Sequence, residues 1–515
     1  MSGRYHGPRL IRTKVTASHE GKELLHGVIL GGRLGPARSR RNATARVVRL
    51  QMPDLRGYRR PLRWLTRFLV RRSIRVRRLP RLDSHPTVCS AALMLLRCLF
   101  GWTTLIAFAA PVFAALSPVE EKIVAAVHAQ AGNFARDLEQ AVQIDSATEN
   151  LAGVRKMADV FNAQLSALGL VTKFIESPAP NGRTGHLVAE HRGTKGQRLL
   201  LIGHLDTVLP GGNVRRDGDQ AFGSGTSDIK GGDLVIIYAL RALHAVGALA
   251  DTQIIVVMTG DEEAVGRPVE VARQALFDAA KRSDLALAFE GAIAKTGTIA
   301  RRGSTSWEIE VQGATGHSSG IFSSAMGAGS VYEAARILQE FYTELRKLDG
   351  LTLNPALIVG GTETALNRTG GTTSGKTNIT AQSTLIRGDL RTVSAEQLAT
   401  AREKMTAIVA KNLPRTSAKI TFSDGYPAMP DSAVNRGLLA QLDQASRDLG
   451  FGEITAYDPR ARGAGDIAFV SPPLPALDGL GIRGGGAHAP TEWADLKTVP
   501  ELVQRTALLI YRLTR

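Results

Sequence analysis

Polar residues that could bind a metal ion or move a proton follow a run of large apolar residues in this sequence. His204 and Asp206 come directly after Leu199–Ile202 and one glycine. A ring nitrogen of His204 can bind a metal, and Asp206 can orient that ring. A His-x-Asp pair that only ends a strand is an equally good interpretation when the motif is taken alone.

Carboxylates recur in similar places further along the chain. Asp228 lies in the glycine-rich stretch 223–232, whose spacing matches neither the dinucleotide-binding pattern nor the P-loop. An acidic residue there is either a helix cap or a metal ligand. Glu262 and Glu263 follow a second apolar run, Thr252–Met258. Successive carboxylates at the end of a buried strand are costly unless a positive charge holds them.

Two more candidates complete the set. Glu290 ends the apolar run Leu285–Phe289, and His488 follows three glycines and an alanine. Each residue alone has an ordinary explanation as a loop or surface residue. Together, carboxylates and imidazoles form a nitrogen and oxygen ligand set suited to zinc, and one shared carboxylate would give a two-metal site.

The order of these motifs resembles that of a di-zinc metallopeptidase family. This family includes bacterial glutamate carboxypeptidase, the nearest in pattern, and also acetylornithine deacetylase, succinyl-diaminopimelate desuccinylase and aminoacylase. The resemblance covers about residues 117–514 and rests on His204-x-Asp206, Gly223-x-Gly225-x-x-Asp228-x-Lys230-Gly231, Asp261-Glu262-Glu263, Phe289-Glu290 and His488. It implies two Zn²⁺ per subunit, which Co²⁺ or Mn²⁺ could replace. His204 and Glu290 would bind one ion, Glu263 and His488 the other, and Asp228 both.

The same resemblance implies roles for residues outside the ligand set. Glu262 would be the general base, and Asp206 would orient the first histidine. His317, in the stretch Gly313-Ala314-Thr315-Gly316-His317-Ser318, resembles a histidine that stabilises the oxyanion. Asn378 and Arg391 resemble contacts to a substrate carboxylate, although a loop asparagine and a solvated strand-end arginine are the plainer interpretations.

The elements that must position these residues form two kinds of pattern. Apolar strands alternate with helices over residues 115–301 and 423–515, which predicts an α/β catalytic domain with a mostly parallel sheet flanked by helices. Residues 302–422 instead read strand–helix–strand–strand–helix–strand. We therefore expect an inserted α+β sandwich, which resembles the lid or dimerisation domain of the family and implies a homodimer.

The net charge of +17 belongs to the amino-terminal region. Residues 1–93 hold 22 Lys and Arg against 4 Asp and Glu, whereas residues 94–515 hold 42 against 43. An arginine-rich arm that binds nucleic acid or a membrane is one interpretation. We favour another, a disordered extension or a mis-assigned upstream start, and expect no nucleic-acid partner.

Residues 94–114 have the features of a signal peptide, which indicates that translation starts at Met94. A short basic head precedes the uncharged, mostly apolar stretch Cys98–Phe113, and Val112-Phe113-Ala114 offers a cleavage site after Ala114. We expect export to the periplasm without a stable membrane partner, a retained membrane anchor being the alternative. Both cysteines precede the cut, which excludes disulfides and cysteine-bound metal from the mature chain.

These features together predict a zinc-dependent amide hydrolase. The expected reaction is that of a carboxypeptidase that releases a C-terminal amino acid, and an N-acyl-amino-acid deacylase is the alternative. The substrate would be a small peptide or N-acyl amino acid with a free carboxylate. A non-catalytic binding protein is disfavoured because Glu262 and the ligand set are intact. Two stretches depart from the family's pattern, 462–466 and 489–492, and we expect both to border the substrate pocket.

Overall fold

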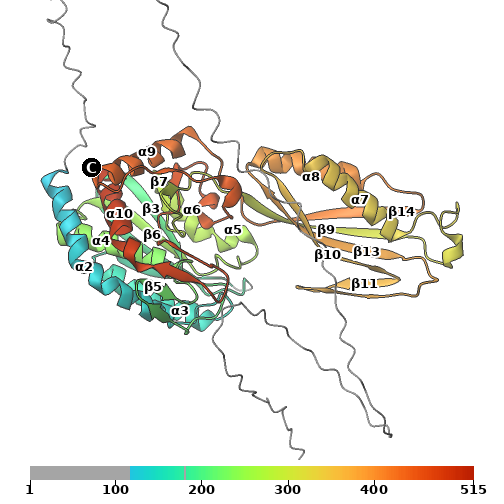
Figure 1. Cartoon of the computed structure of the whole chain (residues 1–515), viewed down its shortest axis with the longest axis horizontal. Helices are drawn as coiled ribbons and strands as arrows, with labels where there is room; N and C mark the ends of the chain where they lie inside the picture. The colour runs from blue at the N-terminus through green and yellow to red at the C-terminus, as the bar shows by residue number, and fades with distance from the viewer. Residues whose placement is uncertain (1–115, 179–180) are drawn as a thin grey trace, which may run out of the picture. The chain divides into compact units, whose positions relative to one another are not determined.

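A computed structural model describes residues 116–178 and 181–515 of the chain (Figure 1). The extension 1–93 and the predicted signal peptide 94–114 lie outside the described residues. No helix in the described ranges combines the length and the apolar character that crossing a bilayer requires.

A six-stranded sheet forms the centre of the catalytic domain, in the order β1-β2-β6-β3-β7-β16. Its strands are β1 (Val171–Glu176), β2 (Gly185–Arg192), β3 (Lys195–His204), β6 (Thr252–Thr259), β7 (Leu285–Ala288) and β16 (Ala476–Leu477). The last four strands of this order are parallel to one another. β2 is antiparallel to both of its neighbours, β1 and β6. The predicted fold class, a mostly parallel sheet in an α/β domain, is therefore confirmed.

Helices cover both faces of this sheet because β3 and β6 are apolar on both sides. Leu199 and Leu201 pack with one group of helices, whereas Leu200 and Ile202 pack with α6 (Gln274–Ala280) and the segment around Ile467. The helices of the first group are α2 (Pro118–Val142), α3 (Leu151–Ser166), α4 (Lys230–Ala245), α9 (Ala433–Asp448) and α10 (Val499–Leu513). A four-residue helix, α5 (Val269–Ala272), precedes α6. The central strands are thus shielded from water on both faces.

The sequence order of the parallel strands brings the candidate residues to one edge of the sheet. His204 ends β3, Glu262 and Glu263 lie just beyond β6, and Glu290 lies just beyond β7. β3 pairs with β6 on one side and β7 on the other. Carboxyl ends of parallel strands are the usual place for a ligand site.

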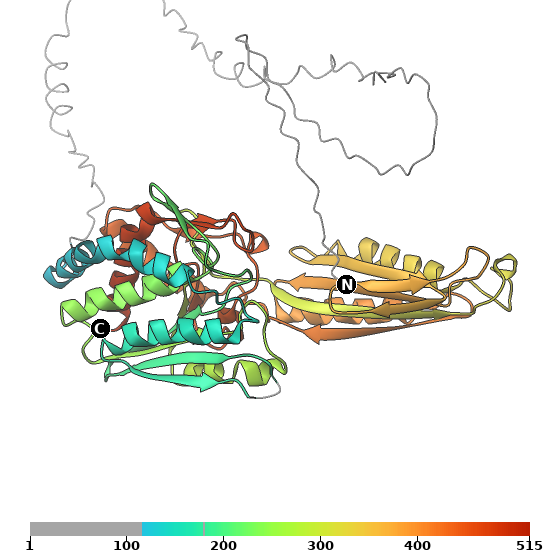
Figure 2. The ribbon, with the colours of Figure 1, turned by 90° about the horizontal axis from the view of Figure 1, so that it is seen from below.

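A separate four-stranded antiparallel sheet, β10-β13-β9-β14, forms the inserted domain. Its strands are β9 (Gly303–Gly313), β10 (Thr352–Gly361), β13 (Ser383–Thr392) and β14 (Thr416–Asp424), and its helices are α7 (Ser330–Leu345) and α8 (Ala395–Val409). Figures 1 and 2 show the two helices side by side over one face of the sheet, where they pack on Trp307 and Ile386. The domain is an α+β sandwich of the predicted order, with an added hairpin of β11 (Glu363–Leu366) and β12 (Gly371–Ser374).

Small strands bring the carboxyl-terminal loop back to the catalytic domain. β17 (Gly484–Gly485) and β18 (Trp493–Asp495) form a second four-stranded sheet with β5 (Gln220–Phe222) and β4 (Arg215–Asp217). His488 lies in the loop between β17 and β18. A two-stranded ladder of β8 (Thr296–Gly297) and β15 (Thr455–Ala456) completes the domain.

Candidate metal centre

His204, Asp228 and Glu290 come from three separate elements and form the first group. The Nε2 atom of His204 lies 3.4 Å from Asp228 Oδ1 and 3.7 Å from Glu290 Oε1. This Nε2 is buried and has no hydrogen-bond partner among the described residues. Ligands at about 2.1 Å from a tetrahedral zinc ion lie about 3.4 Å apart, so the three atoms are spaced to share one ion.

Asp228, Glu263 and His488 form the second group. His488 Nε2 lies 3.2 Å from both Asp228 Oδ2 and Glu263 Oε2. The two oxygens of Asp228 thus face different groups, Oδ1 the first and Oδ2 the second. His488 has a φ of +64°, a conformation uncommon for a residue other than glycine, which also occurs at functional sites. The five predicted ligands are therefore brought together, with Asp228 between the two groups.

Asp206 holds the backbone of the neighbouring strand end. Its carboxylate accepts hydrogen bonds from the backbone N–H groups of Glu262 (2.9 Å) and Glu263 (3.0 Å), and from the hydroxyl of Thr148 (2.6 Å). His204 Nδ1 lies 3.0 Å from the Asp206 carbonyl and 3.4 Å from its carboxylate, so Nδ1–H can donate there and leave Nε2 free as an acceptor. Thr148 has no motif around it and was not predicted from the sequence.

Glu492 supports the loop that carries Asp228. Its buried carboxylate accepts hydrogen bonds from the backbone N–H groups of Gly225 (2.9 Å), Ser227 (2.9 Å) and Asp228 (3.0 Å). Within the stretch 489–492, which is expected to border the substrate pocket, the Glu492 side chain is turned inward against this loop. The position of Glu492 in the sequence, four residues after His488, does not indicate that it supports the Asp228 loop.

A buried arginine supplies the positive charge that the carboxylates after β6 need. Arg273 donates to Asp261 (2.5 Å) and to Asp466 (2.8 Å), and all three side chains are buried. It also contacts the Tyr426 hydroxyl, which donates to the backbone carbonyl of Glu262. The Asp466 side chain, at the end of the stretch 462–466, is therefore a support for Arg273.

The titration of the site follows from crowded carboxylates. Burial raises the pKa of Glu290 to about 7, with Asp228 adding to the shift. Contacts with Asp228 and Glu263 raise the pKa of His488 to about 11. Burial opposes protonation of His204, but Asp206 and Asp228 raise its pKa well above the ordinary value. The cluster attracts positive charge, which is what a metal-binding site requires.

Glu262 lies beside these ligands and has its own titration. Burial raises its pKa well above the ordinary value, Glu290 and Asp466 add to the shift, and His204 opposes it. One oxygen of its carboxylate lies close enough to ligand atoms of His204 and Glu263 for the three residues to hold one metal ion. In contrast to Glu263, it has no contact with His488 among the described residues.

The candidates of the inserted domain, His317, Asn378 and Arg391, make their polar contacts with other residues of that domain. His317 and Asn378 are exposed neighbours, and the Asn378 carbonyl accepts the backbone N–H of Ser318 at 2.9 Å. Arg391 forms an ion pair with Asp389 at 2.8 Å. Within residues 116–178 and 181–515, none of the three predicted residues has a polar contact to a predicted metal ligand.

Comparison with known proteins agrees with this geometry. The model of peptidase family M20/M25/M40 matches residues 200–512. Carboxypeptidase G2 of Pseudomonas sp. (strain RS-16) is 25% identical over 390 residues, 73% of this chain and 88% of that protein. Succinyl-diaminopimelate desuccinylase of Sphingopyxis alaskensis is 33% identical over 175 residues, 31% of this chain and 45% of that protein.

The same fold occurs in a solved structure. The YXEP protein of Bacillus subtilis, described as a dinuclear metal-binding peptidase of the M20 family, superposes with a TM-score of 0.52 at 14% identity. The match covers 75% of this chain and 99% of that one.

Proposed function

Because this chain belongs to peptidase family M20/M25/M40, we propose that it is a di-zinc carboxypeptidase that releases the C-terminal amino acid of a small peptide. The observation that carries the proposal is Asp228, whose two oxygens face two separate groups of nitrogen and oxygen ligands. The similarity to carboxypeptidase G2 extends over most of both chains and favours this reaction.

The ligand set supports zinc as the metal. His204, Asp228 and Glu290 would hold one ion, and Asp228, Glu263 and His488 the other. The unpartnered Nε2 of His204 and the donor spacings of 3.2–3.7 Å fit ions of this kind. When bound, the two ions would make a water molecule more acidic and stabilise negative charge on the amide oxygen.

Glu262 is the proposed general base. It takes a proton from the attacking water and passes it to the leaving nitrogen. Burial raises its pKa above the ordinary carboxylate value, and a more basic carboxylate accepts a proton from water more readily. Asp206 orients His204 and fixes the backbone of Glu262, so it acts through its neighbours.

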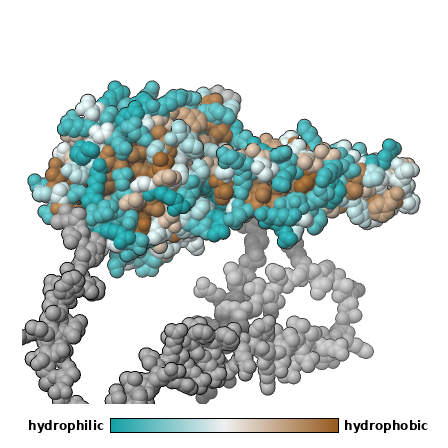
Figure 3. Space-filling model, turned by 90° about the horizontal axis from the view of Figure 1, so that it is seen from above, coloured by the Kyte–Doolittle hydropathy of each residue, from teal (hydrophilic) through white to brown (hydrophobic). Residues whose placement is uncertain are grey.

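The inserted domain would supply the remaining groups. We assign oxyanion stabilisation to His317, and contact with the substrate carboxylate to Asn378 and Arg391. Exposed apolar side chains near His317 favour a homodimer as the setting, since Phe322 is 70% and Tyr332 is 54% exposed. Figure 3 shows apolar residues gathered in patches between hydrophilic ones on one face of the molecule.

An N-acyl-amino-acid deacylase is the second candidate. Both reactions cleave an amide near a carboxylate, and the desuccinylase of Sphingopyxis alaskensis shares 33% identity over its matched part. A screen decides between them: the chain from residue 115, loaded with zinc, is assayed against dipeptides and N-acyl amino acids. Faster hydrolysis of dipeptides supports the carboxypeptidase, and faster hydrolysis of N-acyl amino acids supports the deacylase. If the protein hydrolyses neither class of substrate, the proposed function is contradicted.

Export is part of the proposal. The basic head and apolar stretch of residues 94–114 support cleavage after Ala114 and a periplasmic enzyme. Amino-terminal sequencing of the exported protein should find Ala115 at its start. Peptides from residues 1–93 in exported material would contradict it.

A further inference from the structure

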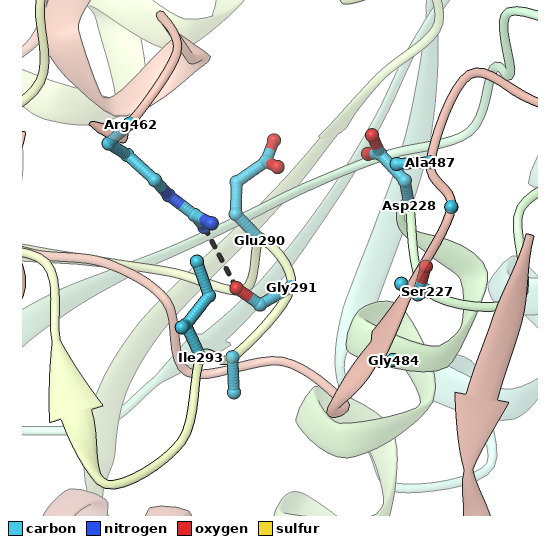
Figure 4. A pocket seen from close by; sticks show the side chains of 11 residues that line it. Ser227, Asp228, Glu290, Gly291, Ile293, Arg462, Gly484 and Ala487 are labelled. Atoms are coloured by element: carbon cyan, nitrogen blue, oxygen red, sulfur yellow. Dashed lines mark hydrogen bonds between the residues drawn. The ribbon is translucent and has the colours of Figure 1, made fainter. Parts of the chain in front are cut away.

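A cavity of about 190 Å³ lies against the candidate metal centre. Asp228 and Glu290 line it, together with small residues of the segments 291–292 and 484–487. Figure 4 shows Asp228 and Ala487 on one side and the Arg462 side chain on the other, reaching toward Gly291 and Glu290. An arginine therefore borders the space next to two proposed metal ligands.

Arg462 has little to hold its charge. The only hydrogen bond of its side chain among the described residues runs from Nη2 to the carbonyl of Gly291 at 2.9 Å, and its Nε is buried with no partner there. No described carboxylate lies within ion-pair distance of it. Arg462 is half-buried, and a guanidinium has five N–H donors, so most of its donors lack a partner among the described residues.

Neighbouring arginines show how different this is. Arg273 has two buried carboxylate partners, and Arg301 is paired with Asp478 at 2.5 Å. Arg460, two residues before Arg462, is exposed and paired with Asp458 at 3.0 Å. In this comparison, Arg462 alone has no carboxylate within ion-pair distance among the described residues, and it borders the cavity.

The surroundings of Arg462 disfavour its charge. Burial lowers its pKa, and the nearby charge of Arg301 lowers it further, whereas Asp478, Glu290 and Asp228 partly oppose the shift. An arginine side chain nevertheless stays protonated near neutral pH. Binding Gly291 uses one of its donors and leaves the cation without a directly paired carboxylate among the described residues, so a structural role for the loop does not account for the residue.

We propose that Arg462 binds a carboxylate of the substrate, so that the catalytic domain has an anion subsite of its own beside the ligand groups. The inference rests on the proposed function. It adds a specificity residue to Arg391, which already has Asp389 as its partner. The cavity and its glycine and alanine walls suit a small group, so the substrates are short amides with a carboxylate close to the scissile bond.

The test compares a carboxylate substrate with its carboxamide analogue. Arg462→Met in the zinc-loaded full chain should raise KM about 10- to 100-fold for the carboxylate, since charge-assisted hydrogen bonds are lost. KM for the carboxamide and the zinc content should not change. Arg462→Lys should restore part of the preference, and Arg460→Met, an exposed neighbour, should behave like the unmodified protein.

Binding provides a readout that does not need turnover. Calorimetry with N-acetylglycine and N-acetylglycinamide should show the carboxylate preference in the unmodified protein and in Arg460→Met, and its loss in Arg462→Met. If the unmodified protein hydrolyses no amide, the proposed function is contradicted. The calorimetric comparison of N-acetylglycine with N-acetylglycinamide would still decide the role of Arg462. An unchanged preference in Arg462→Met, an equal weakening for both ligands, or a loss of zinc without a change in preference would overturn the inference.

Discussion

The catalytic edge of the six-stranded sheet and the exposed end of the inserted domain hold their polar residues in opposite ways. At the sheet edge, Asp206 accepts three hydrogen bonds and Glu492 holds three backbone N–H groups of one loop. In the inserted domain, His317 is exposed and makes its side-chain contact with the nearby Ser319, at 2.8 Å. The first region is ordered by its own chain, and the second presents exposed side chains with few contacts, as the role proposed for His317 requires.

The metal ligands are therefore the part of the site that the fold holds in place in advance. Metal ligands must be held close together against their mutual repulsion, which requires surrounding donors that fix each carboxylate. A residue that meets the substrate only during the reaction can stay solvated until then. Variants of the two regions should therefore fail differently, the first through metal loss or lost proton transfer and the second with its metal retained.

The largest effect is expected within the catalytic edge itself. Glu262→Gln should reduce turnover by about 10²–10⁴-fold, because the amide cannot accept a proton from water. Zinc content should stay full, since the two proposed ligand groups are complete without Glu262. The matched neighbour variant, Glu263→Gln, should instead lose zinc. Metal analysis of the two purified proteins checks this, and equal zinc loss in both would show that the split of roles is wrong.

In the inserted domain, His317→Ala should reduce turnover by about 10²–10³-fold with full zinc content, as expected for a lost oxyanion donor. The comparison is sharpened by mixing His317→Ala with Glu262→Gln protein. If His317 serves the partner subunit, mixed dimers contain one site with both residues intact, and part of the activity returns. Demonstrated subunit exchange without recovery would mean that His317 acts in its own subunit or is only structural.

A smaller effect is expected from the support of Asp206. Thr148→Val removes the hydroxyl that donates to this carboxylate and keeps a similar shape. Zinc affinity should fall about 10- to 100-fold, the usual result of losing such an outer contact. Competition with a chelator measures this. Ser319→Ala, which removes the contact of His317, serves as the control from the other region and should leave zinc affinity unchanged.

The smallest effect is a proton count. The pKa of His488 is raised to about 11 and that of Glu290 to about 7, so near neutral pH His488 holds a proton and Glu290 holds one in part. Zinc binds the deprotonated forms, and the pKa of His204 is also raised well above its ordinary value, so uptake should release more than one proton and affinity should fall as pH falls. Calorimetry in two buffers of different ionisation enthalpy measures the release. Zinc uptake at pH 7 without proton release would contradict the described electrostatics.

The sequence was informative where chemistry follows directly from a local pattern. His204, Glu263 and Glu290 stand just after apolar strands, and parallel strands necessarily bring their carboxyl ends to one edge. The supporting residues could not be predicted in this way. Thr148 lies 58 residues from Asp206, and Glu492 lies 264 residues from Asp228, so no local spacing connects them.

The inserted domain shows a similar limit for secondary structure. The strand β10 covers Thr352–Gly361, although this segment contains a proline. Pro355 interrupts the sequence pattern but is accommodated by a register shift on an edge strand, where its missing N–H is tolerated. The β11–β12 hairpin was missed because its serine, threonine and glycine residues have no apolar alternation.

The central claim is that Asp228 lies between two metal ions. Anomalous diffraction at the zinc absorption edge, from crystals of the zinc-loaded protein, tests it most directly. Two peaks are expected on either side of Asp228, one among His204, Asp228 and Glu290 and the other among Asp228, Glu263 and His488. A single peak, or two peaks of which either lies away from Asp228, would contradict it.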